Sequence, residues 1–172
     1  HRDLHSFPPR RSSDLVGFPA DLDVDMVRFL ARGQRYAYPI RLFFQTMDVG
    51  KASKRKLPRI GGCFATALDG CFGSEDAALL EPYTNDAQNK GVLYYSDKQV
   101  TDFVTAANRA GLQVALHAIG DAAIIQALHA FEAALQDCPR EDHRHIIIHA
   151  SLPTRDSLER IARLGICLSI QP

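Results

Sequence analysis

Residues 111–121 read GLQVALHAIGD and residues 144–150 read RHIIIHA, and these two stretches decide the fold. Each contains a short run, at 114–119 and at 146–150, that is apolar except for one late histidine. Apolar runs of this length predict strands that are buried on both faces. Between them, apolar side chains recur at helical spacing, at Ile124, Leu128, Phe131 and Leu135. A strand, a helix and a second strand in this order predict a parallel pair of strands.

The same alternation continues on both sides of this unit. Further strands are predicted at 38–47, 60–68 and 166–170, and further helices at 23–33, 97–110 and 154–164. Asp97, Asp121 and Thr154 are expected to cap helices. Because such strands need helices over their faces, the predicted fold class is α/β with a parallel sheet. A (β/α)8 TIM barrel and an open doubly wound sheet both satisfy this pattern.

Three segments depart from the alternation. Residues 1–15, HRDLHSFPPRRSSDL, have no periodicity and closely resemble the translation of a common sequencing-library adapter, so we expect an unstructured arm that is an artefact, followed by one domain over 16–172. The basic segment 51–59 lacks interleaved aromatic residues, so we expect a solvated loop. The connection 69–96 is long for a compact domain, and long loops are often functional, which makes it a candidate substrate loop.

Composition narrows the range of partners. The chain has 172 residues, of which 46% are hydrophobic, and 20 basic side chains balance 20 acidic ones. Nucleic acids and anionic membrane surfaces select for an excess of Lys and Arg, so we expect neither as a partner. The sequence lacks a bilayer-spanning apolar run and a secretory apolar run in its first thirty residues, which favours the cytoplasm. The four cysteines form no C-x-x-C pair, and we interpret them as reduced, buried thiols.

Two histidines are the candidate metal ligands. His117 and His149 fall late in the two defining strands and lie 32 residues apart, the length of one βα unit. Side chains at the carboxyl ends of neighbouring parallel strands share one rim, where such folds handle ligands. The alternative for each is a hydrogen-bonded core histidine. His143 and His145 precede their strand and belong to the opposite end of the sheet, so we expect them in an exposed charged turn.

Several other polar residues lie near this rim. Asp121 follows His117 by four residues, and it is expected either to cap its helix or to orient a ligand histidine. Asp69 and Gly70 end the strand at 60–68, where they form a turn or bring a carboxylate to the rim. Together with Ser74 they are the residues that we assign to the substrate loop.

Several sequence motifs resemble the amidohydrolase superfamily, in particular its third amidohydrolase family of metal-dependent hydrolases, which includes N-substituted formamide deformylase. The matching pieces cover most of residues 60–172 in the family's order: ALDGCFGSEDAALLEPY at 67–83, the NKG turn at 89–91, GLQVALHAIGD at 111–121, the AFEAAL helix, RHIIIHA at 144–150 and LGICLSIQP at 164–172.

The resemblance implies an incomplete (β/α)8 barrel, running from about the third strand to the seventh, with helices outside the parallel sheet. His117 and His149 would then be the metal ligands of the fifth and sixth strands. In this family the metal lowers the pKa of a water and polarises a carbonyl, and an aspartate moves the proton. That aspartate and a His-x-His pair belong to strands outside this sequence, so we expect the stretch by itself to be inactive.

One departure from the family concerns the metal count. Relatives place a metal-bridging carboxylated lysine a few residues before the Asp-Gly pair, where this sequence has Ala65. The absence of that lysine favours one divalent ion, zinc, over two, and Cys63 is a remote substitute ligand.

The resulting hypothesis is a metal-dependent amidohydrolase that cleaves a carbon–nitrogen bond in a small non-peptide amide. Two alternatives stay open. One is a doubly wound binding domain without catalysis, and the other is a cyclic amidase or a deaminase on the same barrel. The oligomeric state does not follow from the sequence.

Overall fold

A computed structural model describes residues 42–171. The predicted arm at 1–15, the helix at 23–33 and the first residues of the strand at 38–47 lie outside this range. The described part contains α2 (Val49–Lys54), β1 (Arg59–Ala67), the 3₁₀ turn η2 (Phe72–Ser74), α3 (Asp97–Arg109), β2 (Gln113–Ala118), α4 (Asp121–Asp137), β3 (Ile146–His149), α5 (Arg155–Leu164) and β4 (Cys167–Ser169).

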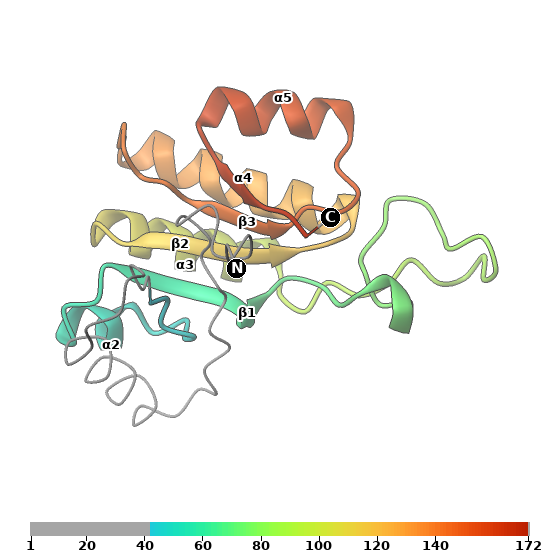
Figure 1. Cartoon of the computed structure of the whole chain (residues 1–172), viewed down its shortest axis with the longest axis horizontal. Helices are drawn as coiled ribbons and strands as arrows, with labels where there is room; N and C mark the ends of the chain where they lie inside the picture. The colour runs from blue at the N-terminus through green and yellow to red at the C-terminus, as the bar shows by residue number, and fades with distance from the viewer. Residues whose placement is uncertain (1–41, 172) are drawn as a thin grey trace, which may run out of the picture.

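The four strands form one parallel sheet in the order β1-β2-β3-β4, so neighbours in the sequence are neighbours in space (Figure 1). A doubly wound sheet reverses its strand order at a switch point. Right-handed crossovers without a reversal place successive helices on the same side of the sheet, as in a barrel wall. The described strands therefore favour the partial barrel over the doubly wound alternative.

The core lies between the sheet and the helices. Val114, Leu116 and Ala118 of β2 and Ile147 of β3 pack against the apolar stripes of α3 and α4. The predicted inward stripe of α4 is largely confirmed, since Ile124, Leu128 and Phe131 are fully buried. On α5, Arg160 forms an ion pair with Glu132 of α4, which joins the two neighbouring helices.

A bulge interrupts β1. Gly62 pairs with Leu116 and Ala67 pairs with His117, so the four residues 63–66 on β1 have no counterparts on β2. Thr66 closes the bulge, because its Oγ1 accepts from the Gly62 N–H at 2.8 Å and lies 2.8 Å from the Ala115 carbonyl oxygen. Bulges of this kind re-aim side chains beside functional sites.

The predicted elements need small corrections at their ends. The first residue of α3 is Asp97, but its cap is Ser96, which forms a capping box with Gln99. Likewise α4 begins at Asp121 and is capped by Gly120. The cap at Thr154 is confirmed, because its side chain accepts from the Ser157 N–H.

Before β1, one prediction is wrong and another is confirmed only in part. The segment 51–59 is not simply a loop, because Asp48 accepts from the Lys51 N–H and starts the short helix α2. In the described part of the strand predicted at 38–47, only Phe44 pairs with the sheet, through a single bridge to Ile60. Asp48 and Gly50 at that point favour a turn into a helix over continued pairing.

Candidate metal centre

Three side chains from three neighbouring strands meet at the carboxyl end of the sheet. Cys63 of β1, His117 of β2 and His149 of β3 each offer a ligand atom, and these atoms lie within 4.8 Å of one another. The two imidazole rings meet edge to face, with centroids 4.6 Å apart. The structure therefore brings together the two predicted histidines and the cysteine that was expected only as a remote substitute.

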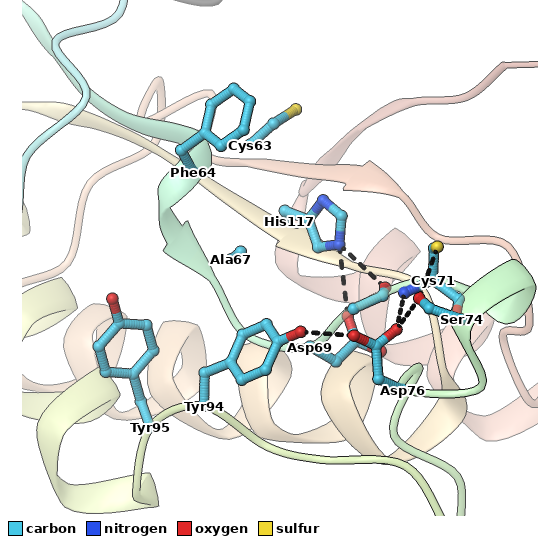
Figure 2. Close-up of a pocket in the computed structure, with 11 residues that line it drawn as sticks. Cys63, Phe64, Ala67, Asp69, Cys71, Ser74, Asp76, Tyr94, Tyr95 and His117 are labelled. Atoms are coloured by element: carbon cyan, nitrogen blue, oxygen red, sulfur yellow. Dashed lines mark hydrogen bonds and ion pairs between the residues drawn. The ribbon is translucent and has the colours of Figure 1, made fainter. Parts of the chain in front are cut away.

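A backbone carbonyl and a carboxylate contact the ring of His117 at its Nε2 atom. Its Nε2 lies 3.3 Å from the Gly70 carbonyl oxygen, to which the Nε2–H donates, and 3.6 Å from Asp69 Oδ1. This leaves Nδ1 as the bare nitrogen, and it is buried with no hydrogen-bond partner. In Figure 2 the ring points this nitrogen to the side on which Cys63 lies. Burial lowers the pKa of His117 and the Gly70 hydrogen bond opposes that shift, so the ring favours the neutral form that binds metals.

His149 reaches the site through an unusual backbone. In the register of the sheet it pairs with Ala118, a fully buried residue that faces the helices, so strict alternation would turn His149 away from the rim. His149 has φ 75° and Ala150 has φ 49°, both in the left-handed region. Non-glycine residues rarely adopt this conformation, and such strain collects at functional sites. The turn brings Nε2 of His149 to 4.0 Å from Cys63 Sγ.

Cys63 reaches the site because of the β1 bulge. The bulge is fixed by Thr66 and by Gln45, whose Oε1 accepts from the Phe64 and Ala65 N–H groups at 3.2 and 3.3 Å. Ala65 lies inside the bulge, and its carbonyl oxygen accepts from the Tyr95 hydroxyl at 3.0 Å. Ala65, which aligns with the family's lysine, thus lies inside the bulge, and Cys63 is the β1 residue that reaches the ligand cluster.

Asp69, predicted for the substrate loop, lies behind His117. It is almost fully buried, and its carboxylate accepts from the backbone N–H groups of Ala78, Ile119 and Gly120 at 2.8 to 3.0 Å. Burial raises the pKa of the Asp69 carboxyl, while these three N–H donors and the nearby His117 oppose that shift. Asp69 thus ties the loop after β1 to the turn between β2 and α4 and supports His117.

Asp121 contacts the loop and not the ligands. Its Oδ1 accepts from the N–H groups of Leu80 and Ala122, both at 2.9 Å. The structure therefore shows neither predicted role, because the N-cap residue of α4 is Gly120 and Asp121 binds the loop from the first position of the helix. The groups behind His117 are Gly70 and Asp69 instead.

An open pocket of about 500 Å³ lies beside His117 (Figure 2). The predicted loop residues Asp69, Gly70 and Ser74 all line it, together with Cys63, Cys71, Asp76 and three aromatic side chains, Phe64, Tyr94 and Tyr95.

A polar network forms one wall of this pocket. The Asp76 carboxylate accepts from the Ser74 hydroxyl, from the Cys71 N–H at 2.7 Å and from the Tyr94 hydroxyl at 2.8 Å. The Ser74 hydrogen bond, followed by those from Cys71 and Tyr94, lowers the pKa of Asp76, which keeps the carboxylate ionised. Of this wall the sequence analysis named only Ser74, because its other members are spread through an irregular loop.

The histidines at the other end of the sheet are not exposed, contrary to expectation. His145 is fully buried and His143 nearly so. His143 Nδ1 accepts from the His145 N–H, while its Nε2–H donates to the Leu164 carbonyl at 2.9 Å. Hydrogen-bond partners, which the sequence does not display, allow these rings to be buried. Both residues precede β3, whereas His149 ends it, so they lie at the opposite end of this strand, as predicted.

The cysteines also differ from the prediction in their exposure. All four are thiols, as expected. None is buried, since Cys63 and Cys138 are half-buried and Cys71 and Cys167 are exposed.

The donor set fits a thiophilic divalent ion. Two imidazole nitrogens and one thiol are ligands that zinc accepts, and a site with three protein ligands leaves a position for substrate or water. The buried, unpartnered Nδ1 of His117 would be satisfied by such an ion. In the part of the chain that the structure covers, this is the one cluster of three metal-ligating side chains.

Two of the known proteins that this chain resembles carry hydrolase names, and a third is named a regulatory protein. The chain is 28% identical to the putative amidohydrolase YtcJ of Bacillus subtilis over 166 residues, which cover 93% of this chain and 31% of YtcJ. It is 41% identical over 140 residues to the exoenzymes regulatory protein AepA of Pectobacterium carotovorum, covering 69% of this chain and 29% of AepA. The chain thus spans about a third of the length of these relatives.

A solved structure similar to this chain also carries a hydrolase name. An uncharacterized metal-dependent hydrolase from Pyrococcus furiosus matches with a TM-score of 0.70 and 30% identity, over 87% of this chain and 32% of that one. Together with the sheet order, this neighbour confirms the predicted fold class, α/β with part of a barrel. The sequence pattern of the amidohydrolase family matches residues 58–172, which include all three candidate ligands, and the chain therefore belongs to the amidohydrolase family.

Proposed function

We propose that this protein is a metal-dependent hydrolase that cleaves a carbon–nitrogen bond in a small, non-peptide amide. One divalent ion, zinc, is held by Nδ1 of His117, Nε2 of His149 and the Cys63 thiolate. The observation that carries the proposal is the bare, buried Nδ1 of His117 in a cluster whose ligand atoms lie within 4.8 Å of one another. Family membership and the names of the similar proteins support it.

The bound ion supplies Lewis acidity, which polarises a carbonyl and lowers the pKa of a water. The chain's own residues orient the ligands and shape the pocket. Gly70 and Asp69 fix the ring of His117, and the bulge places Cys63. The aromatic side chains Phe64, Tyr94 and Tyr95 line the pocket and would offer apolar surface to the substituents of an amide.

The ligand set supports the proposal of a single ion. The family's bridging lysine has no counterpart here, because Ala65 lies inside the bulge and Cys63 is the strand's contribution to the site. A cysteine thiolate and two imidazoles would hold one zinc ion and would leave a position for water or substrate.

Counting metal ions per protein tests the proposal. We expect the purified protein to hold close to one zinc per chain, and His117→Ala and His149→Ala to lose most of it. Cys63→Ser is expected to weaken binding by a smaller factor, because a serine hydroxyl is a poorer zinc ligand than a thiolate. His129→Ala is the matched control, since His129 is an exposed histidine of α4.

The possible outcomes are distinct. Two ions per chain would refute the single-ion centre but leave the hydrolase proposal standing. A folded protein that binds no divalent metal, in wild type and variants alike, would overturn the proposal as a whole. Amide hydrolysis by a longer, metal-loaded protein that contains this stretch, if it disappears in His117→Ala, would support it further.

A further inference from the structure

Gln171 follows β4, and its side chain contacts the candidate ligand His149. The Oε1 atom of Gln171 lies 2.5 Å from Nδ1 of His149. An amide oxygen only accepts hydrogen bonds, so Nδ1 of His149 carries the proton. This assigns the tautomer of the ring, because a neutral imidazole with a proton on Nδ1 has a bare Nε2. That bare nitrogen is the atom that lies 4.0 Å from Cys63 Sγ.

The two candidate ligand histidines are supported in complementary ways. For His117 the protonated nitrogen is Nε2, held by Gly70, and the bare nitrogen is Nδ1. For His149 the protonated nitrogen is Nδ1, held by Gln171. Metal-ligating histidines commonly donate their second N–H to an acceptor, which fixes the tautomer and the ring orientation.

His149 has a particular need for such support. Its left-handed backbone is a conformation that its own side chain does not favour. The backbone hydrogen bonds Ala150 N–H to Ala118 O and Leu152 N–H to Ile119 O, at 2.9 and 3.1 Å, fix the chain just after it. These bonds do not set the rotation of the ring. The contact with Gln171 sets this rotation, because it joins the ring to the end of the neighbouring strand.

We infer that Gln171 is a positioning residue for the metal centre: its side-chain oxygen holds His149 in the tautomer and orientation that present Nε2 to the ion. This inference rests on the proposed function, because it assumes that His149 binds a metal. It goes further in naming a residue that touches neither the ion nor the substrate and yet sets the affinity of the site.

Two substitutions separate the hydrogen bond from the bulk of the side chain. Gln171→Met keeps a side chain of similar length and removes the acceptor, whereas Gln171→Glu keeps an acceptor oxygen in the same place. The matched control is Gln136→Met, since Gln136 is an exposed glutamine on α4. Zinc affinity is measured by competition with a chromophoric chelator, and the protonated nitrogen of His149 is identified by ¹⁵N–¹H correlation NMR in metal-free protein.

We expect Gln171→Met to weaken zinc binding by about 10- to 100-fold, the usual loss when the group behind a ligand histidine is removed. Gln171→Glu should stay within a few-fold of wild type, and Gln136→Met should not differ from it. In metal-free wild type the proton should lie on Nδ1 of His149, and in Gln171→Met it should shift toward Nε2.

The inference is overturned if wild-type His149 carries its proton on Nε2, or if Gln171→Met leaves both zinc affinity and tautomer unchanged. Failure of the proposed function looks different. In that case wild type binds no zinc, while the NMR measurement still shows whether Gln171 sets the tautomer. The wild-type spectrum alone decides the tautomer even if a variant does not fold.

Discussion

At the scale of single residues, His145 makes the stability of the fold depend on pH. The ring is fully buried, and its Nδ1 accepts from the Val114 N–H at 3.1 Å while its Nε2–H donates to Asn108 Oδ1 at 3.2 Å. Burial, reinforced by the neighbouring His143 and Arg140, lowers the pKa of His145 from 6.5 to about 3. The unfolded chain begins to protonate this ring near pH 6.5, whereas the folded protein still keeps it neutral at that pH.

The sign of the pH effect follows from proton binding. Between pH 6.5 and about 3 the unfolded chain binds a proton at His145 that the folded chain does not. Stability from this residue is thus complete above pH 6.5 and falls as the pH drops toward 3, by up to about 1.4 kcal/mol per pH unit. Urea unfolding at several pH values should show a shallower pH dependence for His145→Gln than for wild type.

The control for this prediction is His129→Gln, which changes an exposed histidine and should keep the wild-type pH dependence. Equal slopes for wild type and His145→Gln would show that protonation of His145 does not limit acid stability. At neutral pH, His145→Gln is also expected to be less stable, because it removes a ring that stacks on Phe131 at 5.1 Å.

At the scale of elements, the β1 bulge links strand geometry to the metal centre. In Thr66→Val a methyl group replaces the hydroxyl, and the Gly62 N–H and the Ala115 carbonyl lose a partner in a buried place. Leaving such groups unpaired costs about 1–3 kcal/mol of unfolding free energy. Because the bulge also places Cys63, we expect zinc affinity to fall together with stability.

Urea unfolding of the metal-free protein and a zinc competition assay measure the two effects separately. Thr84→Val is the matched control, since Thr84 is exposed on the loop after β1, and neither quantity should change. Lower stability with unchanged zinc affinity would mean that the bulge does not position Cys63.

The elements also show what the sequence can and cannot predict. Apolar runs and helical spacing depend on burial against neighbours, and they predicted β2, α4 and β3 to within a residue or two. The proposed ligand role of Cys63 depends on a bulge fixed by Gln45 and Thr66, through contacts between residues 19 and 49 positions apart that leave no periodic signal. The sequence likewise did not predict a role for Gln171, because a single exposed polar residue after a strand forms no recognisable pattern. His149 was predicted from its place at a strand end, although the backbone turn that brings it to the rim was not.

At the scale of the whole molecule, the proposed metal centre joins segments that are far apart in the chain. Cys63 and His149 are 86 residues apart, and His117 lies on the strand between theirs. A ligand that binds the folded state alone stabilises it by RT ln(1 + [L]/Kd), about 2.7 kcal/mol at 100 times Kd.

No described helix is long and apolar enough to cross a membrane.

We therefore expect zinc at 100 times its Kd to raise the unfolding free energy of the wild-type protein by about 2.7 kcal/mol. His117→Ala should lose nearly all of this increase, since the cluster falls to two ligands, whereas His129→Ala should keep it. His117→Ala retains all four cysteines, so any change that zinc produces in this variant measures binding outside the centre, including binding to the unfolded chain. Denaturant unfolding with buffered free zinc gives both quantities. An equal zinc effect in wild type and His117→Ala would show that the ion does not bind where the three strands meet, because only a site assembled from all three strands couples zinc binding to the folding of the sheet.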